Sequence, residues 1–116
     1  LGHRFRSSGD TEVLLASYRQ WGRACLQRLN GMFAFVIYDR QTRRVFGARD
    51  RFGVKPLFMH QSRSGIAIAS EIKSLRDAGY TALSIDHGKV LDFLFEGRLD
   101  SSEETLYEGV RRLGAG

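Results

Sequence analysis

Several residue types that define whole classes of protein are scarce in this chain. Cys25 is the only cysteine among 116 residues, which excludes an internal disulfide framework and a structural zinc site built from several cysteines. The longest apolar run, residues 32–38, is too short to cross a membrane as a helix. With no signal-peptide pattern either, the sequence favours a reducing, cytoplasmic setting and no membrane partner.

The usual patterns of catalytic and cofactor sites are also missing. His3, His60 and His87 lie far apart and lack metal-ligand spacing, so we expect no metal site. The glycines form neither a phosphate-binding loop nor a Gly-x-Ser-x-Gly elbow. Cys25 falls in an apolar helical stripe, which favours a structural role over that of a nucleophile paired with histidine.

What is present indicates a folded domain with a basic surface. Hydrophobic residues make up 42% of the chain, which excludes disorder, and the net charge is +5. Arginines cluster around residues 40–51, but no nucleic-acid-binding motif accompanies them, and ion pairs around Arg49, Asp50 and Arg51 are the plainer interpretation. Phe46, Phe52 and Phe58 fit strand-like apolar patterns and are expected in the core. We therefore predict no nucleic-acid partner.

The periodicity predicts antiparallel strands with helices on their faces, an α+β fold. We expect a first helical stretch that is capped by Asp10 and ends at residues 30–31. Gly22 could divide this stretch into two helices. Residues 32–38 are apolar on both faces, which predicts a central strand covered on both sides. The other expected elements are strands 44–49, 57–61 and 65–69, a helix over 71–78 capped by Ser70, and a helix over 86–96.

Five sequence segments occur in one order and together carry a family resemblance. The chain resembles the class II, N-terminal-nucleophile type glutamine amidotransferase domain of glutamine-hydrolysing asparagine synthetases, over nearly its whole length. The segments are 8–15 (SGDTEVLL), 21–22 (WG), 29–35 (LNGMFAF), 48–57 (ARDRFGVKPL) and 69–75 (ASEIKSL).

The resemblance implies an N-terminal-nucleophile hydrolase fold, of which this chain forms a partial αββα sandwich of antiparallel sheets with helices on the outer faces. It also implies covalent glutamine hydrolysis by an N-terminal cysteine. The ammonia released would reach a synthetase domain of the same polypeptide, which activates aspartate with ATP and Mg and forms asparagine.

The family's N-terminal cysteine, its Arg-Gly-Pro-Asp and Asn-Gly-Glu segments and its pyrophosphate loop do not occur here. We therefore expect an N-terminally truncated excerpt with no catalytic residue and no cofactor of its own, inactive in isolation. Residues 1–100 are interpreted as the C-terminal part of the amidotransferase domain. Residues 101–116 are interpreted as the start of a connector to the synthetase domain.

Two site residues follow from the resemblance. Asp10 matches the family aspartate that holds the α-ammonium of glutamine, and a carboxylate is a suitable partner for that charge. Met32 matches a position near the ammonia tunnel, where it would form part of an apolar wall, although a core methionine in a buried strand explains it equally well.

The loop over residues 49–56 is expected to be structural. Gly53 would permit a tight turn, Pro56 would fix the exit into the next strand, and the charged side chains would form ion pairs.

Three alternatives stay open at this point. The domain could be a non-catalytic regulatory or interaction module of the same fold, or it could serve an amidotransferase acting on a carboxylate other than aspartate. A homodimer is also left open.

Overall fold

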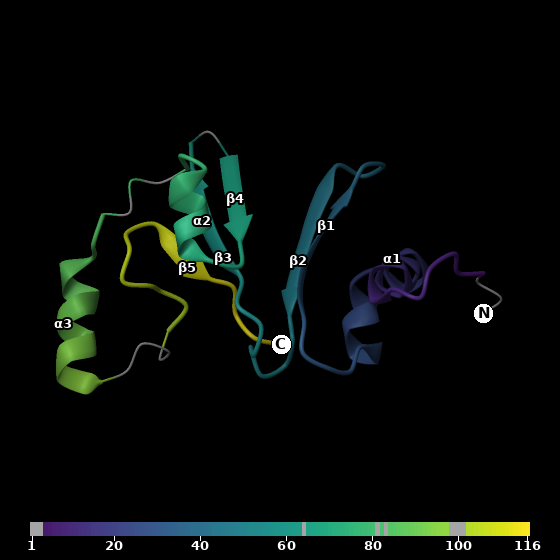
Figure 1. Cartoon of the computed structure of the whole chain (residues 1–116), viewed down its shortest axis with the longest axis horizontal. Coiled ribbons are helices and arrows are strands. Elements are labelled where there is room, and N and C mark those ends of the chain that lie inside the picture. Colours follow the sequence, from purple (N-terminus) through teal and green to yellow (C-terminus); the bar gives the residue numbers. More distant parts are fainter. Residues whose placement is uncertain (1–3, 64, 81, 83, 98–101) are drawn as a thin grey trace. The chain divides into compact units, whose positions relative to one another are not determined.

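The computed structural model describes residues 4–63, 65–80, 82, 84–97 and 102–116 of the chain (Figure 1). The chain divides into two compact units, residues 1–31 and 32–116. Each unit is described by itself below.

The first unit is helical. Helix α1 spans Asp10–Trp21, and a 3-10 segment, Gly22–Arg28, follows it directly. The break that the sequence predicts at Gly22 is confirmed: this glycine has a φ of 55° and ends the α-helix. The helical segment then ends at Arg28, ahead of the stop predicted at residues 30–31.

The second unit contains two antiparallel sheets. Strands β1 (Ala34–Asp39) and β2 (Arg44–Arg49) form a hairpin, with Ala34 opposite Arg49 and Asp39 opposite Arg44. Strands β3 (Phe58–Ser62), β4 (Gly65–Ala69) and β5 (Val110–Arg112) form a sheet in the order β4-β3-β5. Both predicted hairpins are therefore confirmed.

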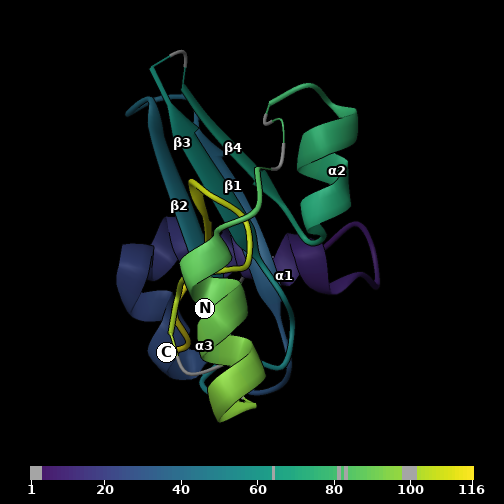
Figure 2. The same ribbon diagram turned by 90° about the vertical axis from the view of Figure 1, so that its left-hand side faces the viewer.

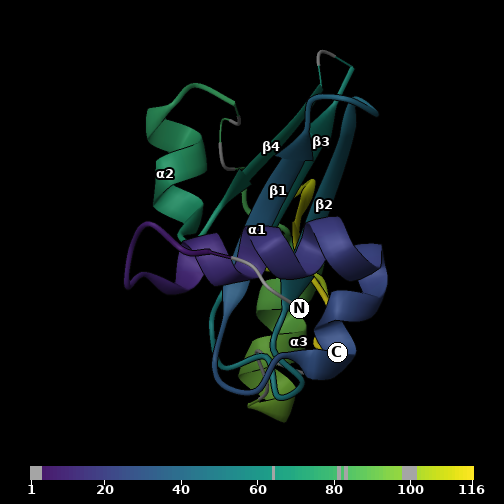
Figure 3. The same ribbon diagram turned by 90° about the vertical axis from the view of Figure 1, so that its right-hand side faces the viewer.

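The two sheets face each other across an apolar cleft of about 410 Å³. When the molecule is viewed at right angles to Figure 1, the two hairpins overlap. The hairpin of β3 and β4 is nearer the viewer in Figure 2, and the hairpin of β1 and β2 is nearer the viewer in Figure 3. The residues that line this cleft come from both sheets and from the segments that flank the three-stranded sheet: Val36, Val45, Gly47, Leu57, Met59, Ile66, Ile68 and Leu113. The described residues thus form an α+β fold in which two small antiparallel sheets are layered.

The core lies between the three-stranded sheet and helix α2, Ile72–Asp77. Figure 1 shows α2 on the side of this sheet that faces away from the β1–β2 hairpin. Leu75 and Val110 are each 2% exposed and meet Ala67 in one apolar cluster. Burying a leucine or valine side chain contributes roughly 1.5–3 kcal/mol, so this cluster is the main apolar anchor of the sheet.

Helix α3 spans His87–Glu96 and begins and ends as its sequence predicts. The carboxylate of Asp86 accepts a hydrogen bond from the amide of Lys89 and caps the helix. Gly97 adopts a left-handed conformation at the other end, with a φ of 66°. Both ends therefore follow standard capping chemistry.

Three predictions about the strands, helices and apolar core of this unit were wrong. Strand β1 pairs only with β2 in the described sheets, and Val36 and Tyr38 are 42% and 60% exposed, so it is not a central strand covered on both faces. Ser70 does not cap α2, whose first flanking residue is Glu71. Phe52 is 90% exposed rather than buried, because it belongs to a loop and not to a strand.

Strand β5 is absent from the sequence-based interpretation. Its three residues, Val110–Arg112, include two arginines and show no apolar run. The strand forms because His60 and Phe58 of β3 offer an unpaired edge, opposite Val110 and Arg112. Only the tertiary pairing reveals it.

Candidate functional site

Asp10 is the first residue of α1 and its side chain is exposed. The sequence predicts that Asp10 caps this helix, and that prediction is wrong. Gly9 occupies the N-cap position, and no side chain caps the helix. Asp10 therefore keeps its carboxylate oxygens available, because none of the hydrogen bonds or ion pairs found among the described residues uses them. A carboxylate in the first turn of a helix is also favoured by the helix dipole.

Glu12 fixes the turn that leads into Asp10, a role that the sequence-based interpretation missed. Its carboxylate accepts hydrogen bonds from the backbone amides of Arg6 and Ser7 and from the Ser7 hydroxyl, at 2.7–3.1 Å. These bonds hold the pKa of Glu12 below its ordinary value, and the bond from the Arg6 amide has the largest effect. A glutamate at the third position of a helix was the available signal, since such residues reach back to preceding amides.

Met32 lies just before β1 and is 65% exposed. The alternative of a core methionine in a buried strand was therefore wrong. The neighbouring Phe33 is tied by its backbone to Asp50 in both directions: its amide donates to the Asp50 carboxylate, and its carbonyl accepts from the Asp50 amide at 2.8 Å. Asp10 belongs to the first unit and Met32 to the second.

Cys25 is fully buried within the 3-10 segment, and burial raises the pKa of its thiol. Both features oppose formation of a reactive thiolate. The ring of His60 shares a hydrogen bond with the Gly109 carbonyl at 3.0 Å, and His87 opens α3. His3 lies outside the described residues.

The most highly organised polar group in the described chain is the carboxylate of Asp50, which is 1% exposed. It accepts hydrogen bonds from four backbone amides, those of Lys55, Val54, Phe52 and Phe33, at 2.9–3.3 Å. The Lys55 amide is the first cause that holds the pKa of Asp50 below its ordinary value, against the opposing effect of burial. The loop after β2 is thus wrapped around one negative charge.

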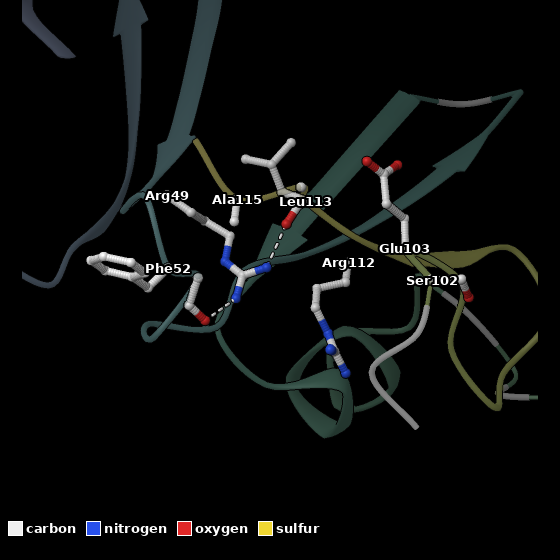
Figure 4. Close-up of a pocket in the computed structure, with 9 residues that line it drawn as sticks. Arg49, Phe52, Ser102, Glu103, Arg112, Leu113 and Ala115 are labelled. Carbon is white, nitrogen blue, oxygen red and sulfur yellow. Dashed lines mark hydrogen bonds between the residues drawn. The ribbon is translucent and has the colours of Figure 1, made fainter. Parts of the chain in front are cut away.

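Arg49, which is 7% exposed, binds carbonyl groups of the same loop. Its Nε donates to the carbonyl of Lys55 at 2.7 Å, and its two terminal nitrogens donate to the carbonyls of Gly53 and Leu113. Figure 4 shows the bond to Leu113, which joins the loop to the segment after β5. A guanidinium suits this role because its donors point in fixed directions.

This arrangement corrects one prediction and confirms another. The sequence predicts ion pairs around Arg49 and Asp50, yet both bind backbone groups. Gly53 does form the predicted tight turn, with a φ of 61°. A methyl group on Gly53 would also lie 3.0 Å from a terminal nitrogen of Arg49, so a side chain is opposed by both conformation and space.

A cleft of about 500 Å³ opens beside this loop. Its lining carries charge of both signs, from Arg49, Arg112 and Glu103 (Figure 4). Arg112 also lies over the ring of Phe58, 5.9 Å from its centre. These mixed charges give the cleft no clear preference for an anionic or a cationic ligand.

The described part of the chain contains neither a metal-binding cluster nor a membrane-spanning helix. No group of three or more His, Cys, Asp or Glu side chains is placed to hold a metal ion. No helix among those residues has the length and apolar character needed to cross a membrane.

Comparison with known proteins places the whole sequence in one group. A family model described as a glutamine amidotransferase domain matches residues 1–116. Because this match runs through both units without a break, it does not separate residues 101–116 from the rest.

Individual relatives agree with the family match. The chain is 47% identical over 112 residues to asparagine synthetase [glutamine-hydrolyzing] 3 of Bacillus subtilis, covering 97% of this chain and 18% of that protein. A Mycobacterium tuberculosis protein that carries the same synthetase name provisionally is 44% identical over 99% of this chain. The amidase chry2 of Gibberella zeae is 28% identical over 97% of this chain.

The relatives are much longer than this chain. It spans 18% of the two synthetases and 16% of the amidase.

Proposed function

Since this chain belongs to the glutamine amidotransferase domain family, we propose that it forms part of the glutaminase portion of an asparagine synthetase-like enzyme. The observation that carries the proposal is the match of residues 1–116 to that domain. The parent protein would hydrolyse glutamine and pass the ammonia to a synthetase portion of the same polypeptide. That portion would bind ATP and Mg and amidate aspartate, in the cytoplasm.

We assign Asp10 to the α-ammonium of glutamine. Two features of its surroundings support this role: the exposed carboxylate has no other partner among the described residues, and Glu12 fixes the turn before it. A charge-assisted hydrogen bond would both orient the substrate and favour it over amides that lack the ammonium.

Met32 is proposed as part of an apolar wall along the path of ammonia. Its 65% exposure supports this role, since a wall residue must present its side chain to an open space. An apolar lining would disfavour protonation of ammonia, because a charged ammonium is costly to place in such surroundings.

The nucleophile is proposed to come from outside residues 1–116. The burial and raised pKa of Cys25 support this, because they leave the lone thiol of the chain poorly suited to attack. Glutamate release from glutamine by the isolated chain, lost on Cys25→Ala, would overturn this assignment.

The central test measures both half-reactions in the complete protein. Asp10→Ala should raise the glutamine KM roughly tenfold or more, the effect of losing one charge-assisted bond of about 1.5–3 kcal/mol. Synthesis supplied with ammonia instead of glutamine should stay within about twofold of the wild type, since ammonia has no α-ammonium to bind. Asp39→Ala serves as the matched control, because Asp39 is a partly exposed aspartate whose carboxylate holds the β1–β2 turn. An unchanged glutamine KM would contradict the role of Asp10.

A second candidate concerns the acceptor. The amidase of Gibberella zeae matches 97% of this chain under a different name. The same glutaminase portion could therefore serve an enzyme that amidates a carboxylate other than that of aspartate. Offering aspartate and a panel of other carboxylates to the complete protein, with ATP and glutamine, would decide between them. If glutamine is not hydrolysed at all, the remaining alternative is a non-catalytic domain of the same fold.

A further inference from the structure

Asn30 is the only asparagine in the chain, and the residue after it is Gly31. The pair ends the first unit, after the 3-10 segment and before β1, and both residues are exposed. In an asparagine followed by glycine, the backbone nitrogen of the glycine can attack the side-chain amide, because no second side chain blocks the approach. The pair therefore has the chemistry needed for spontaneous deamidation.

The local structure leaves both reacting groups free to meet. None of the hydrogen bonds found among the described residues uses the Asn30 carboxamide or the Gly31 amide. Gly31 has a φ of 130°, which side chains rarely adopt, and a methyl group built on it would meet no atom within 4 Å. An exposed segment without backbone hydrogen bonds can rearrange at little cost. Rotation about this link can thus bring the Gly31 nitrogen to the carboxamide carbon of Asn30.

The chain on each side of the pair is hydrogen-bonded. The amide of Leu29 donates to the carbonyl of Leu26 at 3.3 Å. Phe33 is bound to Asp50 through both its amide and its carbonyl. The rearrangement that the reaction needs is therefore confined to a short link, and neither neighbouring segment has to unfold.

We propose that Asn30 is a site of spontaneous deamidation in the folded protein. The Gly31 nitrogen loses its proton to water and forms a bond to the carboxamide carbon of Asn30, while the carboxamide nitrogen takes up a proton and leaves as ammonia. Water then adds to either carbonyl of the resulting succinimide and breaks the bond from that carbonyl to the Gly31 nitrogen. Opening at the former side-chain carbonyl gives aspartate, and opening at the main-chain carbonyl gives isoaspartate.

The product changes both the charge and the backbone of this link. A neutral carboxamide becomes a carboxylate, and in isoaspartate the side-chain methylene becomes part of the main chain. These changes fall immediately before Met32 and Phe33, where the main chain binds the buried Asp50. The modification therefore adds a negative charge and an extra main-chain atom close to the best-ordered loop of the second unit.

Isotope labelling of the complete protein tests the reaction. The protein is incubated at neutral pH in water labelled with heavy oxygen, and its peptides are mapped by mass spectrometry that distinguishes isoaspartate from aspartate. We expect label and isoaspartate at position 30. Gln41 is the internal control, because it is exposed in the β1–β2 turn but its longer side chain must close a larger ring. Label at Gln41 should be lower by roughly tenfold or more. Equal labelling of the two positions, or aspartate without isoaspartate at position 30, would overturn the proposal.

A comparison with the unfolded chain tests the contribution of the structure. The same incubation in concentrated urea measures the reaction of Asn30 without the fold. We expect the rate in the folded protein to lie within about threefold of that rate, since the link is exposed and unbonded. A larger slowing on folding would mean that the structure protects Asn30, and would overturn the proposal. This comparison needs no substitution.

A matched pair of glycine variants tests the mechanism. Gly31→Ala should slow deamidation of Asn30 by roughly tenfold or more, because the added methyl group hinders the attacking nitrogen. Gly22→Ala is the control, because Gly22 also has a positive φ and open space around it but does not follow Asn30. It should leave the rate unchanged. Equal rates in the wild type and in Gly31→Ala would contradict attack by the Gly31 nitrogen.

Discussion

The loop over residues 49–56 and helix α1 differ in a way that regular secondary structure does not reveal. Apart from Arg49, the last residue of β2, the loop has no helix or strand, yet Arg49 and Asp50 are buried and fully hydrogen-bonded. Helix α1 is regular over Asp10–Trp21, yet none of its residues is buried within the described chain. A segment without regular secondary structure can therefore be held in one conformation, when only that conformation provides hydrogen-bond partners for its buried polar groups.

Removing the carboxylate at the centre of the loop should have the largest effect on stability. Asp50→Ala leaves four backbone amides without their acceptor, and buried unpaired donors are costly. We expect the melting temperature of the complete protein to fall by roughly 10 °C or more. Asp39→Ala is the control, because that carboxylate holds a hairpin turn through hydrogen bonds that lie at the surface. Similar shifts for the two variants would remove the contrast between this loop and ordinary turns.

Gly53→Ala should destabilise the protein by a smaller amount, roughly 2–3 kcal/mol, since it combines left-handed strain with crowding against Arg49. Gly97→Ala offers a matched control, because Gly97 has a similar φ of 66° but open space around it. It should cost about 1 kcal/mol, the strain alone. Chemical denaturation of both variants measures the difference. Equal losses would show that Arg49 moves aside and that the loop is less fixed than inferred.

The loop should also contribute to acid sensitivity. Because the pKa of Asp50 is lower in the folded state, its contribution to stability is complete above the unfolded value of about 4 and disappears as the pH falls through the folded-state pKa. Denaturation at a series of pH values should therefore show a shallower loss of stability below pH ~4 in Asp50→Asn than in the wild type. Glu12 and Asp39 have lowered pKa values as well, so part of the slope should remain. Parallel curves for the two proteins would contradict this assignment.

The smallest expected effect concerns the start of α1. Glu12→Ala should speed hydrogen exchange at the amides of Arg6 and Ser7 by roughly threefold to tenfold, because it removes their acceptor. Asp10→Ala should leave exchange at those amides unchanged, since Asp10 accepts no bond from them. Faster exchange in the Asp10 variant would mean that Asp10 helps to hold the turn and is not simply available to a ligand.

Local patterns predicted most of the regular elements correctly. Both hairpins, α2 and α3 lie within a residue or two of their expected positions, because turn residues and apolar periodicity act over short distances. The caps of α3 at Asp86 and Gly97 follow from the same local chemistry. The caps expected at Asp10 and Ser70 were wrong, because a suitable residue type does not decide which residue of a turn takes the N-cap position.

Only part of the candidate site could be predicted from the sequence. The family and Asp10 followed from motifs, whereas the roles of Glu12, Asp50 and Arg49 depend on which backbone groups the fold brings to them. Arg49 binds Leu113, 64 residues away, and no local pattern predicts such a contact.

By itself, the sequence determined the family, the α+β class and the positions of the two hairpins, since these depend on residue order and on interactions between near neighbours. Only the tertiary structure decided that Val110–Arg112 forms a strand that pairs with β3 and that Phe52 is exposed. It also decided that Arg49 and Asp50 bind backbone groups instead of forming ion pairs. The physical reason is that burial of a charge and pairing of a strand edge are set by groups that meet only when the chain has folded.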